Sequence, residues 1–214
     1  MSQNRASMLD RPVAQTFFRY GLPWSAAFLL LSSAGLVDTI FIGRYVGAQA
    51  LAAVNIVSPV FSIFFGMGVM LSVGGTVRSA HHVGRGDLRA ASAVFGRTML
   101  LILLAGLVLA LLSLLFRPLL LTLLGADGDV MRPAYQYLTT ILLFSAVLPA
   151  SYALSQFARV DQHPTLASLG LILSAAVNIF LDYLFIARFG WGVQGAALAT
   201  GLGFSCTLLL FMIH

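Results

Sequence analysis

The stretch TMLLILLAGLVLALLSLLF, residues 98–116, lies between Arg97 and Arg117 and contains no charged side chain. About 20 consecutive apolar residues are enough for one helix to cross the hydrocarbon core of a bilayer. Similar runs recur along the 214 residues, of which 59% are hydrophobic and only 9% charged. Soluble domains carry about 25% charged residues, so this composition excludes soluble enzymes, disordered proteins and secreted disulfide scaffolds. The sequence predicts a polytopic membrane protein.

The apolar runs predict an all-α transmembrane bundle of about six helices, with turns where Gly, Pro, Asp and Arg gather. We expect a polar N-terminal segment over residues 1–12 and a six-helix lobe over 13–214, with helices at about 13–42, 48–77, 90–115, 133–157, 164–186 and 193–214. Because the first apolar run has full membrane length, we interpret it as a transmembrane helix and not as a cleavable signal peptide.

The arginines predict the orientation of the lobe. The larger group falls at one side of the expected helices and comprises Arg5, Arg11, Arg19, Arg78, Arg85, Arg89, Arg97 and Arg159. The smaller group falls at the other side and comprises Arg44, Arg117, Arg132 and Arg188. The positive-inside rule places the larger group in the cytoplasm. We therefore expect an integral protein of the cytoplasmic (inner) membrane with both termini in the cytoplasm.

Two segments of the sequence repeat each other. DTIFIGRY, residues 38–45, matches DYLFIARF, residues 182–189, in the pattern Asp-x-x-Phe-Ile-small-Arg-aromatic. A Gly-x-Gln and an Ala-rich helix start follow each copy. Weak internal symmetry of this kind is common in secondary transporters. Chance similarity between two apolar segments is the alternative interpretation.

Asp38 and Asp182 are acidic residues inside expected spans. Each precedes an arginine, Arg44 or Arg188, by six residues, which places it about 9 Å below the end of its helix. An ionised carboxylate at this depth is costly unless it faces protein, water or a cation. We interpret both residues as proton or cation sites. The alternative is a carboxylate near the membrane interface that pairs with its neighbouring arginine.

Two polar residues are expected near Asp182. Asn178 lies four residues before it on the same helical face, and Thr200 of the next helix lies at a depth between the two. If these helices are antiparallel neighbours, the three side chains converge into an oxygen-rich site suited to a hard cation or a proton. Interhelical hydrogen bonding is the alternative role for Asn178 and Thr200.

An ordered series of motifs resembles the amino-terminal half of multidrug and toxic compound extrusion (MATE) transporters. The motifs are GLVDTIFIG (35–43), GRGD (84–87), LGAD (124–127), NIFLD (178–182) and GVQGAALAT (192–200). The resemblance implies one six-helix lobe of a two-lobe transporter. In the branch named after the DNA-damage-inducible protein DinF, it implies a cation or proton site that comprises Asp38, Asn178, Asp182 and Thr200, with Pro23 at a bend of the first helix.

The chain departs from this family in two ways. The turn after the fourth expected helix reads RVDQHP, residues 159–164, where the family usually has Arg followed by Gly-Asp or Gly-Asn. The chain also has room for one lobe only. We therefore expect a fragment, a truncated product, or a half-transporter that pairs with itself or with another half.

These observations predict a proton- or sodium-coupled antiporter that exports amphipathic drugs or metabolites across the cytoplasmic membrane. We expect no enzymatic activity, because no Gly-x-Ser-x-Gly elbow or phosphate-binding loop is present. We also expect no cofactor, no metal other than sodium at the same residues, and no nucleic-acid partner. Expected partners are an amphipathic or cationic substrate, membrane lipid and a second six-helix lobe. A lipid or glycolipid flippase, whose cavity carries several basic residues, and a lobe without transport activity are the alternatives.

Overall fold

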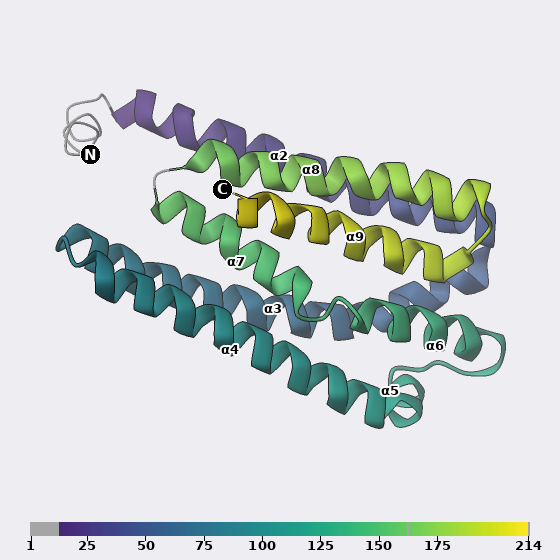
Figure 1. The fold of residues 1–214 in the computed structure, drawn as a ribbon. Helices are drawn as coiled ribbons and strands as arrows, with labels where there is room; N and C mark the ends of the chain where they lie inside the picture. The colour runs from purple at the N-terminus through teal and green to yellow at the C-terminus, as the bar shows by residue number, and fades with distance from the viewer. Residues whose placement is uncertain (1–12, 162, 214) are drawn as a thin grey trace.

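The computed structural model describes residues 13–161 and 163–213, and this part of the chain contains helices and no strand (Figure 1). The α-helices are α2 (Val13–Phe41), α3 (Ala48–Gly84), α4 (Leu88–Leu115), α5 (Arg117–Leu123), α6 (Gly128–Leu142), α7 (Val147–Val160), α8 (Pro164–Asp182) and α9 (Gly192–Ile213). Two π-helical segments, η1 (Ile42–Val46) and η2 (Tyr183–Arg188), follow α2 and α8. The predicted all-α class is confirmed. The polar segment expected over residues 1–12 lies outside the described residues.

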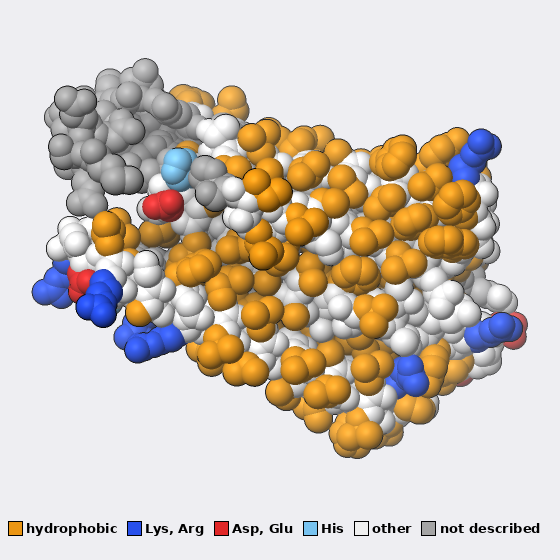
Figure 2. All heavy atoms as spheres, in the orientation of Figure 1, with side chains coloured by type: hydrophobic (Ala, Val, Ile, Leu, Met, Phe, Trp, Pro, Cys, Tyr) orange, Lys and Arg blue, Asp and Glu red, His pale blue; other side chains and the backbone are white. Residues whose placement is uncertain are grey.

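The helices have the dimensions of membrane spans. Within the described residues, α3, α4, α9 and the continuous pair α8–η2 are long and apolar enough to cross a membrane, and α6 with α7 adds a span bent by 45°. α2 has 29 residues, which is also sufficient length. Figure 2 shows hydrophobic side chains over most of the visible face of the lobe. An apolar surface of this extent requires lipid or protein as its neighbour.

The helix bounds differ from the expected ones in three places. α3 continues to Gly84, so the polar residues after 77 extend a helix instead of forming a loop. These polar residues mark the edge of the apolar layer. The residues from 78 to 83 still form backbone hydrogen bonds of an α-helix, which ends at Gly84. The linker expected over residues 117–132 contains the short helix α5. The expected fourth helix, 133–157, is divided into α6 and α7.

Pro149 explains where the fourth span divides. It is the third residue of α7, where a missing backbone N–H is tolerated, whereas inside a continuous helix it would clash with the carbonyl of Ser145. The divided segment also lies against α4. A Cβ added to Gly106 would lie 3.1 Å from both the Ser145 carbonyl oxygen and Ala146 Cα. Glycine at this position therefore lets α4 approach the backbone between α6 and α7.

The helices form two groups that α6 and α7 join. α2, α8 and α9 lie side by side, α3 and α4 form an antiparallel pair, and α6 and α7 contact both α3 and α9 (Figure 1). The α3–α4 turn and the α7–α8 turn lie at one end of the lobe, and η1 and η2 lie at the other. Arg85 and Arg89 are exposed at the first end, which we call the arginine-rich end.

The core between the two groups is closely packed. Val57 of α3, Leu138 of α6 and Ala197 of α9 are all 0% exposed and belong to one apolar cluster. Small residues allow the helices to approach each other, since a Cβ added to Gly68 of α3 would overlap Pro149 of α7. This is the packing expected of membrane helices, whose interfaces are rich in small residues.

Candidate functional site

Asp182 is a fully buried carboxylate. It is the last residue of α8 and is 0% exposed. Neither of its carboxylate oxygens has a hydrogen-bond partner among the described residues. Burial of an unpaired ionised carboxylate costs several kcal/mol, and a proton or a bound cation removes most of that cost. The position therefore offers two free oxygen ligands inside the lobe.

Asp38 of α2 is half-buried and lines a cavity of about 290 Å³. Its Oδ1 atom is buried and also has no hydrogen-bond partner in the described part of the chain. The cavity lies among α2, α3, α6, α8 and α9, and most of its lining is apolar. The lining residues are Ala34, Gly35, Asp38, Val54, Ser58, Phe61, Phe65, Tyr137, Ser174, Asn178, Thr200 and Phe204.

Asn178 and Thr200 meet at this cavity. Asn178 Nδ2 donates a hydrogen bond to Thr200 Oγ1 at 3.4 Å, between the neighbouring helices α8 and α9. Asp182 lies one helical turn beyond Asn178 and is not among the lining residues. The structure thus brings Asp38, Asn178 and Thr200 to one cavity and leaves Asp182 buried beside it, without a direct hydrogen bond to the other three.

Sequence analysis missed Tyr137. This side chain is 7% exposed, lines the cavity and lies within electrostatic range of both Asp38 and Asp182. The signal was present in the helical pattern, since Tyr137 shares a face of α6 with the buried residues Ala134 and Ile141. The phenol of Tyr137 can also donate or accept a hydrogen bond, as carboxylates and amides do.

The two repeated segments adopt similar local structures, although η1 begins four residues after Asp38 and η2 begins directly after Asp182. Each carboxylate is followed by a π-helical segment, η1 or η2. Ile42 and Ile186 occupy matching positions four residues after the carboxylates and are 0% and 2% exposed. Arg44 and Arg188 are exposed, and neither forms an ion pair with a carboxylate in the described part of the chain. Pairing with the neighbouring arginine is therefore not the role of either aspartate in this structure.

Pro23 falls within the bounds of α2, but its side chain lies outside the described residues. The expected bend at this position therefore stays a prediction.

Comparison with known proteins decides the family. The MatE family model matches residues 23–184, which is most of the chain. The chain belongs to the MatE family. Among curated relatives, the multidrug export protein MepA of Staphylococcus aureus (strain bovine RF122 / ET3-1) is 28% identical over 203 residues, which cover 95% of this chain and 45% of MepA. The MatE chain thus spans about half the length of the curated relatives it matches.

Solved structures of MATE transporters share the fold of this MatE chain. It is similar to a multidrug resistance MATE family transporter of the MOP superfamily in the outward-facing conformation, with a TM-score of 0.85 and 27% identity over 91% of this chain and 43% of that chain. It is equally similar to MATE in the straight conformation, with the same TM-score, identity and coverage. The predicted family and architecture are confirmed, and the chain is a membrane-spanning member of a family of transporters.

Proposed function

We propose that this MatE chain is one lobe of a cation-coupled antiporter that exports amphipathic, often cationic compounds across the cytoplasmic membrane. The observation that carries the proposal is Asp182, a fully buried carboxylate whose oxygens have no hydrogen-bond partner among the described residues. Such a group is costly to keep and is useful when it binds and releases a proton or sodium ion.

The polar residues around it have complementary roles in this proposal. Asn178 directs its Nδ2 atom to Thr200, which leaves the Asn178 carbonyl oxygen as an acceptor for a cation or for a protonated carboxyl. Asp38 supplies a second carboxylate at the cavity surface, and Tyr137 lies within electrostatic range of both acids. Oxygen ligands of this kind suit a hard cation or a proton.

The cavity suits an amphipathic cation as substrate. Phe61, Phe65 and Phe204 provide aromatic surface, and Asp38 is the only charged residue among the described lining residues. Aromatic faces and a carboxylate together attract an organic cation. Because substrate and coupling ion both interact with Asp38, the two compete, and this competition couples export to ion entry. A lipid or glycolipid flippase would need basic residues here, and the described lining contains none.

We further propose that a second six-helix lobe, in the same or another chain, completes the transporter. The arginine-rich end faces the cytoplasm in this proposal, because exposed Arg85 and Arg89 lie there. Coupling by protons and coupling by sodium use the same residues and are distinguished by experiment.

Binding to the purified chain tests the site without a second lobe. Tetraphenylphosphonium, an amphipathic cation, is titrated by equilibrium dialysis at varied pH and sodium concentration. We expect binding that protons or sodium weaken. Asp182→Asn removes this dependence, and Asp38→Asn weakens tetraphenylphosphonium binding about tenfold, the effect of one hydrogen-bonded charge.

The matched control is Asp127→Asn, because Asp127 is exposed at the opposite end of the lobe from the arginine-rich end and makes no side-chain cap. This variant should bind as the wild type does. Unchanged ion dependence in Asp182→Asn, with the variant still folded in the membrane, would contradict the assignment of the ion site.

A further inference from the structure

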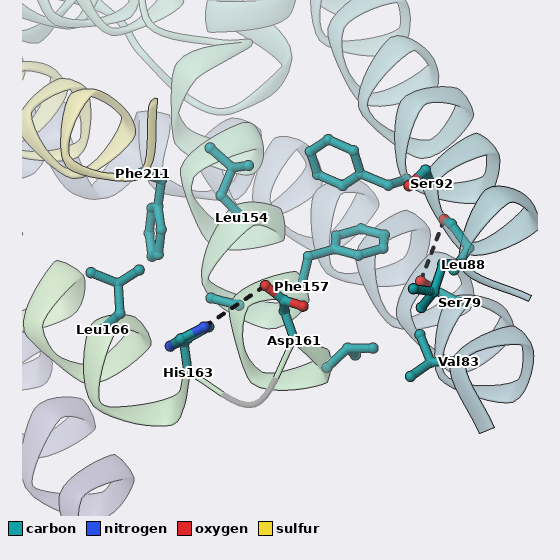
Figure 3. Close-up of a pocket in the computed structure, with 14 residues that line it drawn as sticks. Ser79, Val83, Leu88, Ser92, Leu154, Phe157, Asp161, His163, Leu166 and Phe211 are labelled. Carbon is teal, nitrogen blue, oxygen red and sulfur yellow. Dashed lines mark hydrogen bonds and ion pairs between the residues drawn. The ribbon is translucent and has the colours of Figure 1, made fainter. Parts of the chain in front are cut away.

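A second concavity lies far from the ion site. A groove of about 410 Å³ opens at the arginine-rich end, between α3 and α4 on one side and α7, α8 and α9 on the other (Figure 3). It shares no lining residue with the cavity at Asp38. Its walls are apolar and include Leu154, Phe157, Leu166 and Phe211 (Figure 3). Phe95 of α4 packs edge-on against Phe157 of α7 at a centroid distance of 5.0 Å.

The mouth of the groove is polar. Asp161 and His163, on the two sides of the α7–α8 turn, point toward each other, with 4.0 Å between Asp161 Oδ2 and His163 Nε2 (Figure 3). Their side chains are 85% and 51% exposed. These residues belong to the turn that departs from the usual pattern of MATE sequences.

The groove extends from the arginine-rich end along α7 towards the middle of the lobe. Leu154 lies seven residues before Asp161 along α7, which is about 10 Å deeper at 1.5 Å per residue. The polar interface on each side of a bilayer is roughly 5–8 Å thick. With the mouth at the level of lipid headgroups, as the proposed orientation places it, the floor lies at the level of acyl chains.

The opposite rim carries a net positive charge, since Arg85 and Arg89 outnumber the exposed Asp87 between them. Arg85 and Arg89 lie on either side of the lining residue Leu88 in sequence, and both are exposed. Figure 2 shows basic side chains, with acidic atoms among them, over the end of α3 and α4, and acidic and histidine side chains over the α7–α8 turn. A headgroup with one phosphate and one ammonium matches this arrangement, because the arginines bind phosphate and Asp161 binds an ammonium.

We propose that the groove binds one phospholipid with a primary ammonium headgroup, of the phosphatidylethanolamine class, from the adjacent leaflet. Its ammonium donates hydrogen bonds to Asp161, its phosphate contacts Arg85 or Arg89, and an acyl chain packs between Phe95 and Phe211. A phosphatidylglycerol headgroup has no cation for Asp161, and a choline headgroup has no N–H to donate. The proposal depends on the membrane location of the lobe and not on its transport activity.

Lipid retention by the whole chain tests this site. The protein is reconstituted in vesicles of equal parts phosphatidylethanolamine, phosphatidylcholine and phosphatidylglycerol, then extracted in mild detergent for native mass spectrometry. We expect one retained phosphatidylethanolamine per chain. Asp161→Asn lowers the preference for phosphatidylethanolamine over phosphatidylcholine roughly threefold, the effect of an exposed charge pair. Ser92→Trp places an indole in the groove from an exposed lining position, and this variant retains no lipid there.

Two results would overturn the proposal. Equal retention by the wild type and Ser92→Trp, with both shown to be folded by circular dichroism, would mean that the groove holds no lipid. A phosphatidylethanolamine preference that Asp161→Asn leaves intact would mean that Asp161 does not bind the ammonium group of the lipid. If Ser92→Trp does not fold, the Asp161→Asn comparison decides alone. Asp127→Asn, an exposed acidic residue at the other end, is the matched control and should leave the lipid profile unchanged.

Discussion

Gly203 of α9 lies directly against the backbone carbonyl of Ser174 on α8. A Cβ added to Gly203 would be 2.8 Å from that oxygen and 3.4 Å from Asn178 Cβ. The first contact is with backbone, which cannot rotate away as a side chain can. The glycine therefore sets the close approach of α8 and α9 that allows Asn178 to reach Thr200.

Gly203→Ala should lower the free energy of unfolding by about 1–3 kcal/mol, the usual cost of overpacking. It should also weaken the ion dependence of substrate binding, because α8 and α9 must separate to admit the methyl group. Gly74→Ala is the matched control, since Gly74 is exposed in α3 and nothing lies within 4 Å of its added Cβ. Thermal unfolding in detergent measures both, and equal melting temperatures for the two variants would refute the packing argument.

Asp182→Asn should raise stability while it removes ion coupling. The substitution keeps the shape of the side chain and removes a buried charge that has no hydrogen-bond partner in the described structure. We expect a gain of about 1–3 kcal/mol, measured as a higher melting temperature in sodium-free buffer at alkaline pH, where the wild-type carboxyl is ionised. Asp127→Asn, which is exposed, should change stability by less than about 0.5 kcal/mol. A lower melting temperature for Asp182→Asn would show that the carboxylate has a stabilising partner.

A double-mutant cycle on Asn178→Ala and Thr200→Val should reveal a small favourable coupling. The hydrogen bond between them is long, at 3.4 Å, so we expect about 0.5–1 kcal/mol in the free energy of unfolding. Thr200→Val preserves the volume of the side chain and removes only its hydrogen-bonding capacity. Strict additivity of the two single substitutions would mean that the bond does not form in the membrane.

Arg117 should stabilise the junction of α5 and α6 through its planar guanidinium group. The guanidinium carbon lies 3.7 Å from the centre of the Tyr135 ring, and Nη1 donates to Thr139 Oγ1 at 2.8 Å. Arg117→Lys keeps the charge but loses both the stacking of the planar guanidinium on Tyr135 and the hydrogen bond from Nη1 to Thr139. We expect a loss of about 1–2 kcal/mol and faster hydrogen exchange in α5. Arg188→Lys, at an exposed position on the same end of the lobe, should have no measurable effect.

The expected helices agree with the structure over long stretches, because uninterrupted apolar runs in a bilayer leave the backbone no other way to satisfy its hydrogen bonds. The same reasoning could not locate the interruption at residues 143–146. A proline such as Pro149 is compatible with a kinked helix or with the start of a new one. In this structure a new helix starts, and the residues before it contact Gly106 on α4, which lies about 40 residues earlier in the chain.

The depth argument from the sequence placed Asn178 and Thr200 at a similar level, and the structure brings them to 3.4 Å. Depth alone did not reveal the position of Asp182 outside the cavity lining, or that Tyr137 lines the cavity together with Asp38. Depth follows from counting residues along one helix, whereas these relationships depend on the rotation of α6, α8 and α9 about their own axes.

By itself, the sequence determined that this protein is a membrane-spanning helical bundle with two matched aspartates inside its spans. Hydropathy and helical rise depend only on residues that are close together in the sequence, so the sequence is sufficient to determine them. Only the tertiary structure decided which side chains share a cavity, where a buried carboxylate lacks a partner, and which end of the lobe carries a groove with charged rims. Those features arise where residues far apart in sequence pack together, and their positions depend on close contacts between helices such as that of Gly203 with Ser174.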